Sequence, residues 1–516
     1  MPGNGLWRTK SIEQSIADTD EPDTRLRRDL NAWDLTVFGV AVVIGAGIFT
    51  LTARTAGDLT GPSVSLSFVL AAVACALAAL CYAEFASTVP VAGSAYTFSY
   101  ATFGEFLAWV IGWDLVLEFA VGAAAVAKGW SVYLQTVLGY IFGDSVTTST
   151  KIGGLTVDWG ALLLVVVLAV LLVLGTKLSS RVSLVITSIK VAIVLFVILL
   201  GAFYIKFANY RPFVPPPAES AAGGSGVEQS LFSLIAGSSG STFGLFGLLA
   251  GASLVFFAFI GFDVVATTAE ETRNPQHAVP RGILGSLAIV TVLYVAVAFV
   301  VTGMVNYRQL ATTTTPSGAP DRKTLATAFA DNGVDWAANI ISIGALAGLT
   351  TVVMVLMLGQ VRVLFAMSRD GLLPRALART GEHGTPVRAT VLVSVLIAFA
   401  ATFFEIGRLE EMVNVGTLFA FILVSGGVII LRRTRPDLHR GFRMPGVPVL
   451  PILAILACLW LMLNLTVLTW LRFVAWMIIG VVIYFAYGRR RSVLGGAPTS
   501  TPLPVTEAKP TDLPDR

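Results

Sequence analysis

Glycine interrupts two of the apolar segments of this chain where a membrane helix would be expected to continue. The first interruption is Gly45-Ala46-Gly47, and the second is at Gly261, within residues 256–263. In a bilayer every backbone N–H and C=O must be satisfied within the protein, so unwound backbone survives only where it lines a cavity or holds a ligand. Two such interruptions, one in each half of the chain, predict a ligand site near the middle of the membrane.

The composition assigns the chain to the membrane. Of its 516 residues, 55% are hydrophobic and 13% are charged, whereas soluble globular proteins carry about 25% charged residues. Residues 1–30 are polar and lack the apolar core and the cleavage site of a signal peptide. The N-terminus is therefore expected to stay on the side where it was made.

The apolar segments have the length of membrane helices. About twelve of them, each of about twenty residues, follow one another and would cross the hydrocarbon core as helices. Their centres lie near residues 44, 77, 118, 167, 192, 257, 292, 352, 395, 421, 460 and 480. We therefore expect an all-α integral membrane protein. Arginine and lysine gather in alternate connections, which predicts cytoplasmic N- and C-termini, with the plasma membrane as the expected location.

The sequence gives little indication of enzymatic chemistry. The histidines His277, His383 and His439 lie in loops or at the edges of apolar segments, and the cysteines show neither metal-ligand nor disulfide spacing. We expect no catalytic residue, no metal and no cofactor. The net charge of +4 comes from basic residues at membrane edges, so nucleic acid is not an expected partner.

The two interruptions offer complementary polar groups. A helix that restarts after residues 45–47 exposes free N–H groups at its positive end, and glycine lets a carboxylate approach them. Residues 257–261 offer the carbonyls of an ending helix, which suit an ammonium group. An α-amino acid would satisfy both. The alternative is that the glycines only allow close helix packing, but Asp263 is expected to cap a restarted helix, and such a cap presupposes a break.

Six motifs lie within about residues 30–490. They are VIGAGIF at 43–49, CYAEFA at 81–86, VAGSAY at 91–96, FFAFIGFD at 256–263, EETRNPQ at 270–276 and SRDGLLP at 368–374. Together they resemble the cationic amino acid transporter branch of the amino acid–polyamine–organocation superfamily. The resemblance implies two inverted repeats of five helices, with the first and sixth helices broken, then two further helices, and transport by alternating access.

On this resemblance the chain divides into six parts. We expect a cytoplasmic segment at 1–30, a first repeat at 31–206, an extracellular loop at 207–243, a second repeat from 244 through 405 with its last helix ending at 432, two further helices at 433–488, and a disordered cytoplasmic tail at 489–516.

The resemblance also implies a set of substrate-binding residues. They are Val43, Ile44, Gly45, Ala46, Gly47, Phe257, Ala258, Ile260 and Leu356. Residues 45–47 would offer amides to the carboxylate, and the carbonyls of residues 43, 44, 257 and 260 would receive the ammonium. Phe257 is either an aromatic gate over the substrate or a packing residue.

Lys190 lies within an apolar run at 182–200, whose only other polar residues are Ser183, Thr187 and Ser188. A lysine at the centre of a membrane helix costs about 2.5–3.5 kcal/mol, and a lysine in a dry site can gain and lose a proton during a transport cycle. The resemblance implies that it bonds the carbonyls freed at the first break, where sodium-coupled relatives hold a sodium ion. We predict Lys190 as the proton-coupling residue; the alternative is that its ammonium reaches the cytoplasmic edge.

Other buried charges are expected to have supporting roles. Glu118 is a second candidate for proton coupling or for pairing with a cationic side chain, and Lys128, about 15 Å further along the helix, is too far to pair with it. Glu84, Glu270 and Glu271 are expected to form gate or structural ion pairs. Arg273 and Arg362 are the basic residues available as their partners.

The eighth helix presents an apolar face around Leu356, where cationic-selective members align a small hydroxyl residue. We therefore favour broad neutral specificity, with arginine or lysine next. The predicted function is secondary active L-amino acid transport, coupled to protons, with the lipid bilayer as its surroundings. The alternatives are an exchanger selective for arginine and lysine, or a non-transporting amino acid sensor of the same fold. The sequence leaves open a small accessory membrane subunit.

Overall fold

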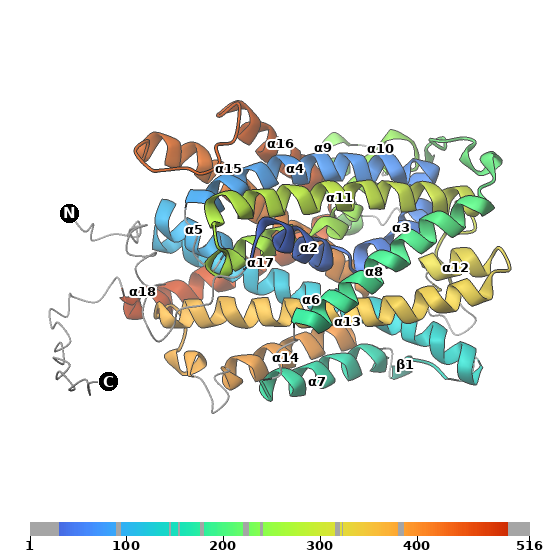
Figure 1. Cartoon of the computed structure of the whole chain (residues 1–516), viewed down its shortest axis with the longest axis horizontal. Helices are drawn as coiled ribbons and strands as arrows, with labels where there is room; N and C mark the ends of the chain where they lie inside the picture. The colour runs from blue at the N-terminus through green and yellow to red at the C-terminus, as the bar shows by residue number, and fades with distance from the viewer. Residues whose placement is uncertain are drawn as a thin grey trace, which may run out of the picture.

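The computed structural model describes residues 30–88, 94–143, 146–152, 155–175, 180–219, 226–237, 241–314, 320–321, 323–379 and 386–493. Long helices run roughly parallel to the long axis of the molecule (Figure 1). The protein is an all-α integral membrane protein, as its hydropathy predicts. The N-terminal segment expected at 1–30 and the tail expected at 489–516 lie outside the described residues, apart from Leu30 and residues 489–493.

The helices of the first half are α2 (Ala32–Val43), α3 (Thr52–Thr55), α4 (Val64–Thr88), α5 (Ser94–Thr102), α6 (Glu105–Phe142), α7 (Trp159–Val173) and α8 (Ser180–Gly201). Those of the second half are α9 (Leu231–Ala236), α10 (Gly244–Val255), α11 (Pro275–Met304), α12 (Leu325–Ala330), α13 (Asp335–Arg369), α14 (Val387–Phe403), α15 (Ile406–Thr434), α16 (Val449–Leu463), α17 (Val467–Ile483) and α18 (Arg489–Arg491).

Short 3-10 or π turns extend or connect these helices. They are η1 (Gly47–Leu51), η2 (Ala56–Thr60), η3 (Gly61–Ser63), η4 (Ala202–Tyr204), η5 (Phe207–Tyr210), η6 (Gly226–Glu228), η7 (Phe256–Phe259), η8 (Phe262–Glu271), η9 (Arg375–Ala378) and η10 (Tyr484–Gly488). Among the described residues, two-stranded antiparallel sheets pair β1 (Ser149–Ile152) with β2 (Leu155–Asp158), β3 (Ala218–Glu219) with β4 (Ser241–Thr242), and β5 (Thr313–Thr314) with β6 (Pro320–Asp321).

The helices agree with the spans expected from hydropathy. Among the described residues, eight helical stretches are long and apolar enough to cross a membrane, and α7, α14 and α16 are shorter apolar helices. The longest stretch, residues 32–88, has 57 residues, whereas one crossing needs about twenty. It is interrupted at Gly61, whose φ is 66°, and at Pro62, so it contains two of the expected spans. Each expected span centre falls on a helix or at a helix break.

Both predicted breaks are present. The helix α2 ends at Val43, Ile44 is extended with ψ of 95°, and the chain resumes a helical conformation at Ala46 before η1. In the second break, Ile260 is extended after η7, and Gly261 has a φ of 112° before η8 begins. That φ lies in the left-handed region, where side chains are strained and glycine is not.

The expected cap at the second break takes a different form. Gly261 occupies the capping position of η8, and no side chain caps this turn. Asp263 lies two residues further on, is buried, and its Oδ1 atom has no hydrogen-bond partner within the described part of the chain. The carboxyl group nevertheless faces the backbone N–H groups of Gly261, Asp263 and Val264, where η8 begins.

Corresponding helices of the two halves pack against one another. The helix α2 contacts η8, α4 contacts α11, α6 contacts α13, and α7 contacts α14. In Figure 1, α4 and α11 lie together along one edge, α6 and α13 run through the middle, and α7 and α14 lie at the opposite edge. Contact between equivalent elements is the pattern that a two-fold axis between the halves produces.

The last turns of α4 form an ion-pair network with the end of α15 and the connection that follows it. Glu84 accepts hydrogen bonds from Arg432 at 2.8 and 2.6 Å and from the Met444 amide at 2.8 Å, and its Oε1 atom lies 3.4 Å from Arg440 Nε. Glu84 is therefore in an ion pair as expected, but its partners are not Arg273 or Arg362. The side chains of Glu270 and Glu271 lie outside the described residues.

Replacing Glu84 with glutamine is expected to lower the free energy of unfolding by about 3 kcal/mol, because removing one partner of a buried ion pair leaves the other charge uncompensated. Arg432 and Arg440 would then face each other without an anion. Thermal unfolding in detergent, with the exposed Glu228→Gln as the matched control, measures the effect. Equal melting temperatures for the two variants would contradict it.

Candidate ligand-binding site

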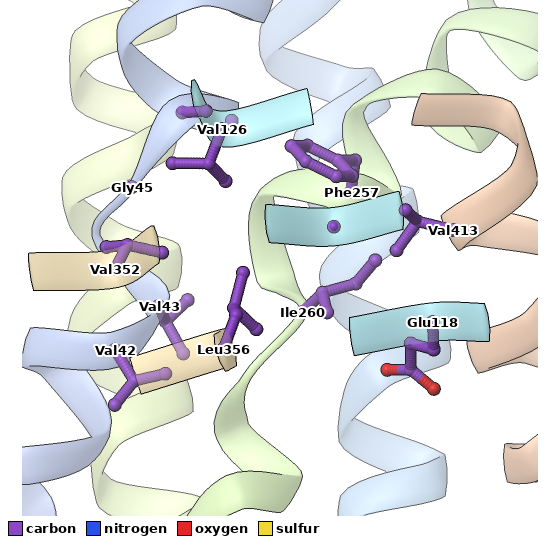
Figure 2. A pocket seen from close by; sticks show the side chains of 13 residues that line it. Val42, Val43, Gly45, Glu118, Val126, Phe257, Ile260, Val352, Leu356 and Val413 are labelled. Carbon is purple, nitrogen blue, oxygen red and sulfur yellow. The ribbon is translucent and has the colours of Figure 1, made fainter. Parts of the chain in front are cut away.

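The two broken helices meet at a small cavity of about 30 Å³ inside the bundle. It is lined by both breaks and by α6, α13 and α15, and Figure 2 shows their side chains converging on it. The lining residues are Val42, Val43, Gly45, Ala46, Gly47, Glu118, Gly122, Val126, Phe257, Ile260, Val352, Leu356 and Val413. A volume of this size holds about one water molecule, so the site is nearly closed in this conformation.

Most residues expected at the site from the sequence line this cavity. Seven of the nine expected substrate-binding residues are in the lining, and so is Glu118. Ile44 and Ala258 are not, although both are buried. A Cβ atom on Gly47 would overlap the Cα atom of Ala258, so these two residues are where the backbones of the broken helices come closest. Ala258 therefore packs against Gly47 in this conformation, and its role in binding stays a prediction.

Sequence reasoning missed five lining residues, namely Val42, Gly122, Val126, Val352 and Val413. Helical spacing in the sequence could have identified three of them. Gly122 and Val126 follow Glu118 at intervals of four, and Val352 precedes Leu356 by four, so each shares a helix face with a residue already selected. Val413 lies on α15, and no pattern in the sequence connects it with the breaks.

Backbone carbonyls before and just after the first break accept hydrogen bonds from other helices. The Val43 carbonyl accepts a hydrogen bond from the Tyr294 hydroxyl at 2.7 Å, and the Phe49 carbonyl accepts one from the Tyr133 hydroxyl at 2.7 Å. A carbonyl oxygen has two lone pairs, so Val43 can still accept a second hydrogen bond. The two tyrosines hold the backbone of the break in place, and sequence reasoning missed both.

Lys190 is buried, with 2% of its surface exposed, and does not line the cavity. Its Nζ atom donates to the Ala41 carbonyl at 2.8 Å. The usual helical partner of that carbonyl is the amide of Gly45, four residues on, which lies in the break. The lysine stem passes Gly348 of α13, where a Cβ atom would lie 3.0 Å from Lys190 Cγ. The ammonium thus sits among α2, α8 and α13 and does not reach a membrane edge.

Glu118 lies at the cavity in a region rich in buried acids. It is 2% exposed, and Asp114 and Asp263 are 0% and 2% exposed. Neither carboxyl oxygen of Asp114 has a hydrogen-bond partner in the described structure. Lys128 is far from this group, as expected, and its Nζ atom lies 3.4 Å from Asp158 Oδ2. Among the described residues, no group of three or more His, Cys, Asp or Glu could hold a metal ion.

A second, larger cavity of about 1110 Å³ approaches the site from one end of the bundle. Its lining includes Ser253 and Leu254, about one helical turn before Phe257. Arg54, which lines this cavity, forms an ion pair with Glu410 at 2.8 Å, and the pair joins the first broken helix to α15. Phe257 lines the small cavity about one helical turn from the lining of the larger one.

The other end of the two broken helices is closed by backbone contacts. The Arg273 amide donates to the Leu30 carbonyl at 3.0 Å, and Leu30 pairs with Thr272 in a parallel bridge. This backbone contact ties the first broken helix to the second on the side of the small cavity away from the larger cavity.

The sequence is similar to those of known membrane transporters. The sequence matches the model of the family described as amino acid permease over residues 30–488. The chain is 42% identical over 496 residues to the branched-chain amino acid permease BcaP of Bacillus subtilis (strain 168), covering 95% of this chain and 99% of that protein. It is 40% identical, with the same coverage, to the methylthioribose transporter of the same organism. It is 35% identical over 438 residues to the vacuolar cationic amino acid transporter 4 of Arabidopsis thaliana, covering 84% of this chain and 68% of that protein.

Proposed function

The chain belongs to the amino acid permease family, and on that premise we propose that it transports L-amino acids with neutral aliphatic side chains. Transport is secondary active, driven by protons, and proceeds by alternating access. The protein lies in the plasma membrane with both termini in the cytoplasm. The observation that carries the proposal is one cavity that combines the backbone of both breaks with an apolar wall.

The backbone at the breaks suits the two charges of an amino acid. Gly45 and Gly47 line the cavity at the start of a helical segment, where amides attract a carboxylate. Phe257 and Ile260 line it at the end of the other segment, where carbonyls attract an ammonium. The α-carboxylate and the α-ammonium therefore each have a place, and the side chain projects toward α6, α13 and α15.

The wall that faces the side chain favours a neutral one. Val126, Val352, Leu356 and Val413 offer no hydrogen-bond acceptor from their side chains, and an unpaired cation in such a place is costly. Glu118 is the carboxylic acid in the described lining. Its carboxylate would pair with a cationic side chain, so it supports arginine or lysine as the alternative substrate. The apolar wall and the name of the permease of Bacillus subtilis both favour a branched aliphatic side chain.

Protonation of Lys190 gives a physical route to coupling. A charged ammonium forms a stronger hydrogen bond to the Ala41 carbonyl than a neutral amine does. The proton therefore stabilises the arrangement in which α2 is held against α8 and α13. Loss of the proton weakens this contact and frees the inner half of the first broken helix to move. Glu118, at the cavity itself, is the second candidate for carrying the proton.

Uptake of radiolabelled leucine by proteoliposomes with an imposed pH gradient tests the proposal. We expect leucine to accumulate and a protonophore to abolish accumulation. Unlabelled isoleucine and valine should compete more strongly than arginine or lysine. Binding without accumulation would instead identify a sensor, and uptake only into vesicles preloaded with amino acid would identify an exchanger.

A second candidate substrate is methylthioribose, because a relative with 40% identity is named as its transporter. Its thioether would suit the apolar wall, but it has no carboxylate for the amides at residues 45–47. The same competition assay decides between the two candidates. Strong inhibition of leucine uptake by methylthioribose, with no inhibition by valine, would favour the sugar.

A further inference from the structure

Gly122 differs from the other glycines of the site in what surrounds it. A Cβ atom on Gly47 would overlap the backbone of Ala258, and one on Gly45 would come within 3.3 Å of Val352 Cγ2. A Cβ atom on Gly122 would make contacts of ordinary length, 3.6 Å to Leu356 Cδ1 and 3.9 Å to both methyl groups of Val413. Among the glycines in the described lining, Gly122 alone leaves room for a methyl group.

The usual reasons for a membrane-helix glycine do not apply to Gly122. Such glycines commonly let the backbone of a neighbouring helix come close, but the nearest atoms to a Cβ at this position belong to the side-chain tips of Leu356 and Val413. Gly122 also lies within the unbroken helix α6, where alanine would be the better helix former. The absent side chain therefore creates space in the cavity and serves neither packing nor a turn.

The space beside Gly122 lies where the substrate side chain is expected. It is bounded by α6, α13 and α15, away from the broken backbone that would hold the two charges. Figure 2 shows Leu356 and Val413 directed into the region between these helices. An aliphatic side chain that enters here would contact Leu356 and Val413, and its outer carbons would pass over Gly122.

We propose that Gly122 is a specificity-determining residue that sets the upper size of the substrate side chain. This rests on the proposed function and deepens it. Branched side chains such as those of leucine and isoleucine use the space that Gly122 leaves open, whereas alanine does not reach it. A single methylene group in an apolar pocket changes selectivity by about 10- to 200-fold, so one added methyl group is enough to change the preferred substrate.

The experiment compares leucine and alanine uptake by the wild type and by Gly122→Ala in proteoliposomes. We expect the ratio of the leucine KM to the alanine KM to rise by about ten-fold or more. Gly426→Ala is the matched control, because a Cβ atom there meets no atom within 4 Å. A ratio within about two-fold of the wild-type value would overturn the proposal.

A second variant enlarges the space beside Gly122 instead of filling it. Val413→Ala removes the methyl groups that face Gly122. Because it adds no atoms, it cannot overpack the cavity, so it also tests the proposal if Gly122→Ala fails to fold. We expect phenylalanine to become a better competitor of alanine uptake by about ten-fold, and an unchanged value would count against the proposal. A wild type that takes up no neutral amino acid would refute the proposed function, whereas unchanged ratios in an active protein refute only the role of Gly122.

Discussion

Replacing Lys190 with methionine is expected to reduce proton-driven accumulation of leucine to background. Methionine keeps most of the length and apolar character of the lysine stem, so the contact with Gly348 can persist. It cannot bind a proton or donate to the Ala41 carbonyl, which accepts from Lys190 Nζ at 2.8 Å. Accumulation against a gradient, measured in proteoliposomes with an imposed pH difference, reports this loss directly.

The control for this prediction is Lys206→Met, at a lysine on the surface that bonds Asn332. Exchange of labelled for unlabelled leucine, without a pH gradient, should persist in Lys190→Met because the lysine does not line the cavity. Undiminished proton-driven accumulation would remove Lys190 from the coupling mechanism. Loss of both exchange and folded protein would show that its role is structural.

Replacing Gly47 with alanine is expected to reduce leucine transport by about a hundred-fold. The added Cβ atom would overlap Ala258 at the point where the two broken helices meet, and forcing a methyl group into a packed site costs about 1–3 kcal/mol or more. Because the obstructing atoms include the Ala258 backbone, the two breaks must move apart. The amides and the carbonyls would then no longer fit the two charges of one substrate.

Gly45→Ala provides the comparison for Gly47. Its added Cβ atom would lie 3.3 Å from the tip of Val352, and a side chain can shift where a backbone cannot. We expect a loss of about ten-fold or less, since small adjustments cost about 1 kcal/mol. Initial uptake rates, corrected for the amount of folded protein by size-exclusion chromatography, measure both variants. Equal effects would show that the close contact between the breaks is not what makes Gly47 necessary.

Much of the fold could be predicted because the bilayer constrains each segment of the chain according to its own sequence. Each apolar stretch of about twenty residues must be a helix, and glycine at membrane depth signals a break in that helix. These rules predicted breaks at residues 45–47 and 257–261, where the structure has them at Ile44 and at residues 260–261, and they identified Lys190 as a buried charge. They act along the chain and need no knowledge of which helices are neighbours.

The partners of individual groups could not be predicted in this way. Glu84 pairs with Arg432 and Arg440, which are more than 300 residues away in the sequence, because the connection after α15 folds against the end of α4. The sequence instead suggested Arg273 and Arg362, which are merely basic residues near membrane edges. The same limitation applies to Ala258, whose packing against Gly47 requires two helices from different halves to meet.

The sequence by itself determined that this protein crosses the membrane repeatedly and that two of its helices are broken, because hydrophobicity and backbone satisfaction are properties of local segments. Only the tertiary structure decided which helices wall the cavity between the breaks, that Tyr294 bonds the Val43 carbonyl and Lys190 the Ala41 carbonyl, and that Gly122 faces Leu356 and Val413. These contacts join residues distant in sequence, and they exist only where helices from both halves approach one another.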